Sequence, residues 1–286
     1  MTEFGYLHDQ LKRSFELSGK AKSTFKNYIR CLAHMALYHH CCPSTLSDDQ
    51  VQDYLNYCKN QHQTPSESFF KHTIYGLRSA YKVLNLPDKK IALPQIKRQN
   101  KLPIILNYDE TRQLLCAPKY LRHRMMLAVL YGCGLRSYEL CNILLSEVDV
   151  ERKTILIRQQ KGRFDRYLPL GDHLSRGLEK YIDICNPSKF LFNSQVSPDS
   201  DPRPITVRTI QWLIKECCSK VDTHKHFTAH TLRHTYATHL IEQGLNILTI
   251  QQLLGHARIE TTLIYLHVAQ NENSPKYSPL DKLFNW

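Results

Sequence analysis

A basic, proline-bearing segment from Leu86 to Pro103 most constrains what this chain can fold into. Pro87, Pro94 and Pro103 stiffen the segment and deny it regular hydrogen bonding. Its charged residues are one acid, Asp88, and the bases Lys89, Lys90, Lys97, Arg98 and Lys101. Apolar residues recur at helical intervals on both sides of it. The chain therefore divides into a predicted domain over 1–86, a linker over 87–104 and a second domain over 105–286. The linker's charge suits either a phosphate backbone or plain solvation.

The first 86 residues predict a bundle of amphipathic helices. Their apolar residues recur every three or four positions, which places them on one face of each helix. These residues are Phe4, Leu7, Leu11 and Phe15; Phe25, Tyr28, Leu32 and Met35; Val51, Tyr54 or Leu55, and Cys58; and Phe70, Ile74, Leu77, Tyr81 and Leu84. Ser47 and Gln50 have the spacing of a capping box, and Pro65 after Thr64 suits a helix start. Basic residues on the exposed faces fit either a clamp on DNA or an ordinary solvated surface.

Beyond residue 105 the pattern predicts helices interrupted by one β-hairpin. Asn107 and Glu110 frame a helix start, and the glycines at Gly132 and Gly134 end the next helix, so that Arg136 opens another. Alternating runs over 154–157 and 166–170 predict the hairpin, with Lys161 at or beside its turn. Further helices are expected over 172–184, 207–218, 229–243, 248–254 and 261–267. The predicted fold is mainly α with a small β-hairpin in the second domain.

The charge of the chain favours a polyanionic partner. Lysine and arginine exceed the acidic residues enough to give a formal net charge of +12 and an isoelectric point near 9.2. A solvated basic surface is the alternative. No signal sequence and no run of about 18 apolar residues is found, which predicts a soluble, unexported protein. The ten cysteines lack a regular framework, so we expect reduced thiols.

Two arginines have the setting of a phosphate site. His230 and Arg233 are three positions apart on a helix that Thr228 can cap, so both lie on one face near a positive helix end. Arg136 also lies at a helix start. Two guanidinium groups can each offer paired donors to the non-bridging oxygens of one phosphate. The alternative for Arg136 is a structural ion pair with Glu139, three residues further on.

A tyrosine and a lysine can complete such a site. The hydroxyl of Tyr265 is a poor nucleophile unless another group takes or shares its proton, and His230 or His256 could do so. Its apolar neighbours Ile264 and Leu266 also suit a core aromatic residue. An ammonium group at Lys161 could protonate a leaving 5′ oxygen, although hairpin turns often carry exposed lysines.

The spacing of three histidines is also compatible with a metal site, but other features of the sequence disfavour one. His226, His230 and His234 are spaced by four residues, and Cys217 and Cys218 precede them. No CxxC pair or HExxH motif is present. An arginine among the ligands would repel a cation, so no metal site is predicted.

The blocks that hold these residues resemble the tyrosine recombinases, also called the phage integrase family. They read YGCGLRSYEL at 131–140, KGRFDRYLPL at 161–170, HTLRHTYATHL at 230–240, LLGH at 253–256 and TTLIYLHV at 261–268. The chain looks most like Xer-type and transposon-associated bacterial integrases. The resemblance extends over nearly the whole chain, and the first domain matches it by pattern.

The resemblance implies a fold and a site. The fold is an N-terminal SAM-like helical core-binding domain and a mixed α/β catalytic domain, which grip duplex DNA as a C-shaped clamp. The implied catalytic residues are Arg136, Lys161, His230, Arg233 and His256 around the phosphate, with Tyr265 as nucleophile. Glu139 supports Arg136. Neither a cofactor nor a metal is expected.

The resemblance also implies an activity and partners. Site-specific recombination would pass through a 3′-phosphotyrosyl link, without metal or ATP. The expected assembly is a homotetramer on two sites of double-stranded DNA, monomeric or weakly oligomeric when free, with a tail at about 271–286 docking on a neighbour. An accessory directionality factor and a place on the nucleoid in the bacterial cytoplasm, with no membrane, are implied too. A type IB topoisomerase and a non-catalytic DNA-binding protein are the alternatives.

Overall fold

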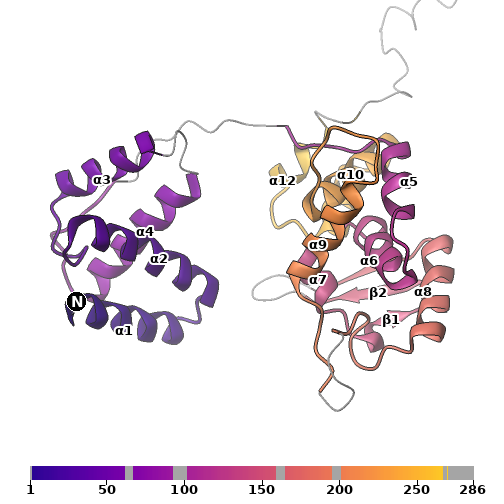
Figure 1. Ribbon diagram of the computed structural model, residues 1–286, viewed down its shortest axis with the longest axis horizontal. Helices are drawn as coiled ribbons and strands as arrows, with labels where there is room; N and C mark the ends of the chain where they lie inside the picture. The colour runs from indigo at the N-terminus through magenta and orange to yellow at the C-terminus, as the bar shows by residue number, and fades with distance from the viewer. Residues whose placement is uncertain are drawn as a thin grey trace, which may run out of the picture. The chain divides into compact units, whose positions relative to one another are not determined.

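The computed structural model describes residues 2–61, 67–92, 102–158, 165–194, 201–266 and 269. Two compact units, residues 1–100 and 101–286, each have an apolar core of their own. The fold class predicted from the sequence is confirmed, because helices predominate and the sheet is small (Figure 1). All ten cysteines are free thiols. In the part of the chain that is described, none of the helices has the length and apolarity needed to span a membrane.

The first unit is the predicted helical bundle. Its helices are α1 (Thr2–Leu17), α2 (Lys22–His39), α3 (Asp48–Gln61) and α4 (Glu67–Val83). The predicted apolar faces form its core, in which Leu7, Leu32 and Ile74 are fully buried. Ser47 and Gln50 exchange the two hydrogen bonds of the expected capping box, at 3.2 and 2.9 Å. The helix start predicted at Pro65 lies outside the described residues.

The first part of the predicted linker packs on this unit. Ile91 is buried in its core, and its carbonyl accepts hydrogen bonds of 3.0 and 2.8 Å from the Arg78 guanidinium. Lys89 donates to the carbonyls of Ser44 and Leu46 at 2.6 and 3.0 Å. Lys89 therefore satisfies backbone acceptors of the loop between α2 and α3. Residues 93–101 of the linker lie outside the described residues.

The second unit consists of helices and a small antiparallel sheet. In chain order its helices are α5 (Tyr108–Cys116), α6 (Leu121–Gly132), α7 (Ser137–Cys141), a 3₁₀ turn (Leu145–Glu147), α8 (Asp172–Cys185), α9 (Val207–Cys218), α10 (Ala229–Glu242), α11 (Ile247–Leu254) and α12 (Glu260–Leu263). Side chains cap α5 at Asn107 and α10 at Thr228, as the sequence predicts. In α10, buried residues occur on all sides, so this helix runs through the interior.

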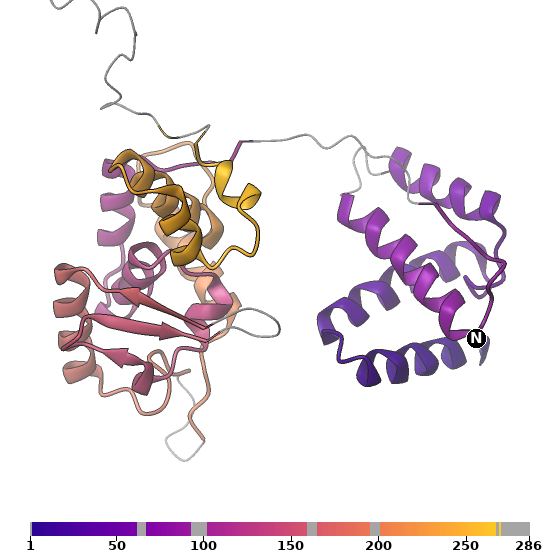
Figure 2. The same cartoon turned by 180° about the vertical axis from the view of Figure 1, so that it is seen from behind.

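The described strands form an antiparallel sheet in the order β1 (Val148–Asp149), β2 (Thr154–Ile157) and β3 (Arg166–Pro169), seen side by side in Figure 2. Ile155 pairs with Leu168, and both are buried, which confirms the predicted hairpin and its alternation. Strand β1 was not predicted, because a two-residue strand is too short to show a periodic pattern. Lys161 lies outside the described residues.

The last predicted helix is shorter than expected. It ends at Leu263, and the next residues continue as a turn in which the Tyr265 amide donates to the Thr262 carbonyl at 3.1 Å. Such bonds between residues three apart tighten the end of a helix. Tyr265 therefore lies just beyond α12, and the placement of this residue on a helix was wrong.

Gly134 lies in the turn between α6 and α7, at a position that suits glycine better than any residue with a side chain. Its φ is +58°, and an added Cβ would lie 2.3 Å from Cδ1 of Tyr236. We expect Gly134→Ala to lower the free energy of unfolding by about 2–4 kcal/mol, because backbone strain adds to a clash. Urea denaturation followed by tryptophan fluorescence would measure this, since both tryptophans belong to the second unit.

Substitutions at two other glycines distinguish the cost of backbone strain from the cost of the steric clash with Tyr236. Gly244 has a φ of +84° with nothing within 4 Å of an added Cβ, so its alanine variant should lose only about 1 kcal/mol. Gly171 has a φ of −65° and equally open surroundings, and its alanine variant should stay within about 0.5–1 kcal/mol of the wild type. Equal losses at all three positions would contradict the proposed clash with Tyr236.

Candidate active site

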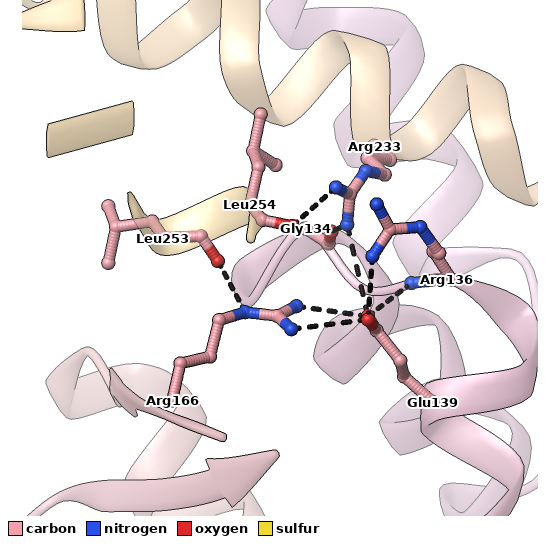
Figure 3. A network of polar contacts seen from close by, with 7 residues as sticks. All are labelled: Gly134, Arg136, Glu139, Arg166, Arg233, Leu253 and Leu254. Atoms are coloured by element: carbon pink, nitrogen blue, oxygen red, sulfur yellow. Dashed lines mark hydrogen bonds and ion pairs between the residues drawn. The ribbon is translucent and has the colours of Figure 1, made fainter. Parts of the chain in front are cut away.

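Arg136 and Glu139 form one side of the candidate site (Figure 3). Arg136 immediately precedes α7, and its backbone N–H donates to Glu139 Oε2 at 2.9 Å. Its side-chain Nη1 donates to Glu139 Oε1 at 2.8 Å. The arginine side chain is 26% exposed, whereas the glutamate side chain is 8% exposed. The ion pair that the sequence left as an alternative is therefore present, and it leaves part of the guanidinium accessible.

Arg233 lies deeper in the same site. Its side chain is 3% exposed, and its two terminal nitrogens donate to the carbonyls of Gly134 at 2.7 Å and Leu254 at 2.5 Å. Nη1 also lies 3.8 Å from Glu139 Oε2. Burial, and then the charge of Arg136, lower the pKa of Arg233 to about 10, so the group stays cationic at neutral pH. The structure thus brings both predicted arginines to one carboxylate.

Arg166 was missed by the sequence reading. It begins β3, and its Nη1 and Nη2 donate to the two carboxylate oxygens of Glu139 at 3.2 and 3.0 Å, while Nε donates to the Leu253 carbonyl at 2.8 Å (Figure 3). A signal existed in the sequence. Arg166 is two residues before the inward-facing Leu168, so a cation falls on the buried face of a strand.

Glu139 is ionised by this surrounding charge. Burial by itself raises its pKa, but hydrogen bonds and charge from Arg166, followed by those of Arg136, bring the pKa below its ordinary value. The carboxylate therefore keeps its negative charge at neutral pH. It links the helix start at Arg136, the strand at Arg166 and the central helix at Arg233.

The side chain of Tyr265 is buried in a small apolar cluster. It is 1% exposed and packs with Ala237, Ile241, Ile250 and Leu254. Its hydroxyl lies 3.0 Å from Nδ1 of His234. Burial raises the pKa of Tyr265, and the charges of Arg233 and Arg136 act in the opposite direction. Tyr265 is therefore the core aromatic residue that its apolar neighbours suggested, and its hydroxyl has a polar partner.

The sequence did not point to His234 as the partner of the Tyr265 hydroxyl, because His230 and His256 were the residues expected there. Burial, and then the charges of His230 and Arg233, lower the pKa of His234 to about 4, so this ring is neutral at neutral pH. With its proton on Nε2, Nδ1 accepts a hydrogen bond from the Tyr265 hydroxyl. Nothing in the sequence indicated this contact, because His234 was considered only for its spacing of four residues from His230, which is a spacing of metal ligands.

Two of the remaining predicted residues, His256 and His230, belong to the described part of the chain. The Nδ1 atom of His256 is 2.9 Å from Oγ1 of Thr262, and its ring centroid is 6.4 Å from that of Tyr265. Gly255, with a φ of +62°, ends α11 and turns the chain into His256. His230 is exposed in the first turn of α10. Among the described residues, no group of three or more potential metal ligands is placed to hold an ion.

Comparison with known proteins identifies the family. The profile described as the phage integrase family matches residues 98–272, and the one described as the phage integrase N-terminal SAM-like domain matches residues 7–85. The chain belongs to the phage integrase family. This confirms the resemblance read from the sequence, including the SAM-like N-terminal domain, and it identifies a recombinase of the tyrosine type.

Individual relatives agree with this assignment. A tyrosine recombinase of Thermosipho africanus is 37% identical over 231 residues, which cover 77% of this chain and 78% of that protein. The tyrosine recombinase XerA of Pyrococcus horikoshii is 32% identical over 254 residues, 88% of this chain and 86% of that one. The fold is similar to that of the Tn1549 transposon integrase, solved with a circular-intermediate DNA, with a TM-score of 0.70 and 18% identity over 91% of this chain and 94% of that one.

The pKa of His234 gives a testable pH dependence. Between its ordinary value of 6.5 and its folded value of about 4, the unfolded chain binds a proton that the folded chain does not. Stability therefore falls as the pH is lowered through this window. We expect His234→Asn to flatten the dependence of the unfolding free energy on pH between 6.5 and 4, measured by urea denaturation.

His123 and His239, whose pKa values are also lowered by burial, keep their contribution in both proteins, so the difference between the two slopes isolates His234. A variant whose slope equals that of the wild type would show that His234 titrates normally in the folded protein.

Proposed function

We propose that this recombinase cuts and rejoins duplex DNA through a covalent 3′-phosphotyrosyl intermediate formed by Tyr265. One observation carries the proposal. Arg233, which shares the Glu139 carboxylate with Arg136, is hydrogen-bonded to the carbonyl of Leu254, a neighbour of the Tyr265 ring, and the next residue, His234, lies 3.0 Å from the Tyr265 hydroxyl. A phosphodiester bound by the two guanidinium groups would bring its phosphorus close to that hydroxyl.

Each proposed role follows from the chemistry of its side chain. Arg136 and Arg233 hold the non-bridging oxygens and stabilise the charge that builds up on them. Tyr265 attacks phosphorus, and the 5′ oxygen leaves with a proton that Lys161 supplies. His230 and His256 complete the contacts to the phosphate. His234, 3.0 Å from the Tyr265 hydroxyl, orients that oxygen, and because its pKa is lowered to about 4 it is a weak base, so His230 or His256 takes the proton of the nucleophile.

The proposed reaction requires neither ATP nor a metal ion. One phosphoester is exchanged for another of similar energy, so the expelled 5′ hydroxyl of a partner strand can reverse the step without ATP. Enzymes accelerate slow reactions by roughly 10⁶ to 10¹⁷-fold, and preorganised charge supplies much of this. The two arginines provide at the phosphate the charge that a metal ion provides in other enzymes.

The proposed partner is double-stranded DNA. The net charge of +12 favours it, and relatives of the same fold, such as the Tn1549 integrase, have been solved with DNA. We further propose that the helical unit acts as a core-binding domain and that four copies assemble on two DNA sites. The tail at about 271–286 would dock on a neighbour, and an accessory factor would set direction. Such a protein would act on the nucleoid in the bacterial cytoplasm.

A covalent-adduct assay tests the nucleophile. We expect the wild-type protein to form a denaturation-resistant adduct with a nicked substrate that loses its 5′ hydroxyl strand after cleavage. Tyr265→Phe should form none, since it lacks the attacking oxygen. Tyr236→Phe is a matched control from the neighbouring helix and should keep the adduct. A full yield of adduct from Tyr265→Phe would remove Tyr265 as the nucleophile.

The relative size of two losses tests the proposed electrostatics. Arg136→Gln removes charge at the phosphate and should slow single-turnover cleavage by about 10³-fold. His256→Gln removes a hydrogen-bonding group and should slow it by about 10- to 100-fold. Both variants need only bind DNA normally for the comparison to hold. A larger loss for His256→Gln would mean that proton transfer, and not charge, limits the reaction.

A further inference from the structure

Arg166 contacts the parts of the site that hold the expected catalytic residues, and three of its five N–H donors are used there. Its three side-chain nitrogens donate to Glu139 and to the Leu253 carbonyl, and its side chain is 9% exposed. Leu253 precedes the Gly255–His256 turn, and Glu139 holds Arg136. These three donors of Arg166 are thus directed at the protein, and its side chain is largely buried.

The hydrogen bonds to the Glu139 carboxylate are shared unequally among the three arginines. Arg166 covers both carboxylate oxygens with a bidentate pair at 3.2 and 3.0 Å, whereas the Arg136 side chain makes one hydrogen bond to it, through Nη1 at 2.8 Å. Arg233 Nη1 remains at 3.8 Å. A bidentate pair is the stronger arrangement. The negative charge of Glu139 is therefore balanced chiefly by Arg166.

The charge balance decides what remains for a substrate. Three guanidinium groups and one carboxylate leave a net charge of +2 in the cluster. Without Arg166, Glu139 would pair with Arg136 and Arg233, and the net charge would fall to +1. A carboxylate with only those partners would also compete with a phosphate for their donors.

We propose that Arg166 is a positioning residue that neutralises Glu139, and so keeps the charge and donors of Arg136 and Arg233 available to a phosphate group. The inference builds on the proposed function, because it assigns the phosphate of DNA to these two arginines. It adds a residue that the reaction itself does not touch. The part of its effect that concerns phosphate binding passes through Glu139.

If this mechanism is right, a second substitution can restore the phosphate binding that the loss of Arg166 weakens. A purely structural role of Arg166 allows no such recovery. If Arg166 acts by balancing Glu139, neutralising the glutamate should repair the loss of the arginine. If Arg166 only holds β3 and α11 in place, removing a second bonded partner should leave the defect unchanged or deepen it. The double variant Glu139→Gln with Arg166→Gln distinguishes the two.

The experiment is a titration with inorganic phosphate, followed through the guanidinium NMR signals of Arg136 and Arg233 in the full chain. Arg166→Gln should weaken phosphate binding by about tenfold, the scale of one unit charge at a partly exposed site. The double variant should return to within about twofold of the wild type. Arg176→Gln, which removes an exposed arginine of α8, is the matched control and should change nothing.

Several outcomes would overturn the proposal. They are unchanged phosphate binding in Arg166→Gln, and a double variant as weak as the single one. Should Arg166→Gln fail to fold, Glu139→Gln decides the question. Charge balance predicts tighter phosphate binding in that variant, and loss of a structural anchor predicts weaker binding.

The adduct assay separates this inference from the proposed function. If the phosphate pattern holds while the wild-type protein forms no adduct on DNA, the role of Arg166 stands and the assigned reaction falls. If the adduct forms but the double variant does not recover phosphate binding, the inference alone falls.

Discussion

The ion cluster around Glu139 is the interaction on which the candidate site depends. Three guanidinium groups in a half-buried space repel one another, and burial makes each charge more costly. The effect is visible at Arg233, whose pKa falls to about 10 through burial and the charge of Arg136. Glu139 offsets this cost, because its carboxylate contacts all three arginines while the cluster keeps a positive net charge. The surface that we propose to bind phosphate is thus held in place before any phosphate arrives.

Helix α10 gives this cluster a fixed frame. Leu232 belongs to the main core of the second unit, whereas Ala237 and Ile241 belong to the small cluster beneath Tyr265. Arg233 lies between them and is tied to the carbonyls of Gly134 and Leu254. A helix buried on all sides has few ways to shift, so the positions of its polar side chains follow from apolar packing.

Tyr265 belongs to an apolar cluster and is also the proposed nucleophile. Its ring is enclosed by aliphatic side chains, and its hydroxyl is paired with a neutral histidine. An aromatic residue with a polar tip suits such a boundary, since the ring gains from burial while the oxygen keeps a hydrogen bond. The apolar cluster fixes where the hydroxyl lies, and the arginines set the electrostatic field around it.

The sequence by itself determined the helical bundle, the hairpin, the caps at Asn107 and Thr228 and the family, because these depend on periodicity and on motifs read along the chain. It also placed Arg136, Arg233 and Tyr265 together by resemblance. Only the tertiary structure decided which groups bind each other. Arg166 joins Glu139 from 27 residues away, and His234, instead of His230 or His256, is the hydrogen-bond partner of the Tyr265 hydroxyl, 31 residues away in the chain. Such pairings arise because α11 packs against α10, α12 and β3, and no local pattern of residues records this packing.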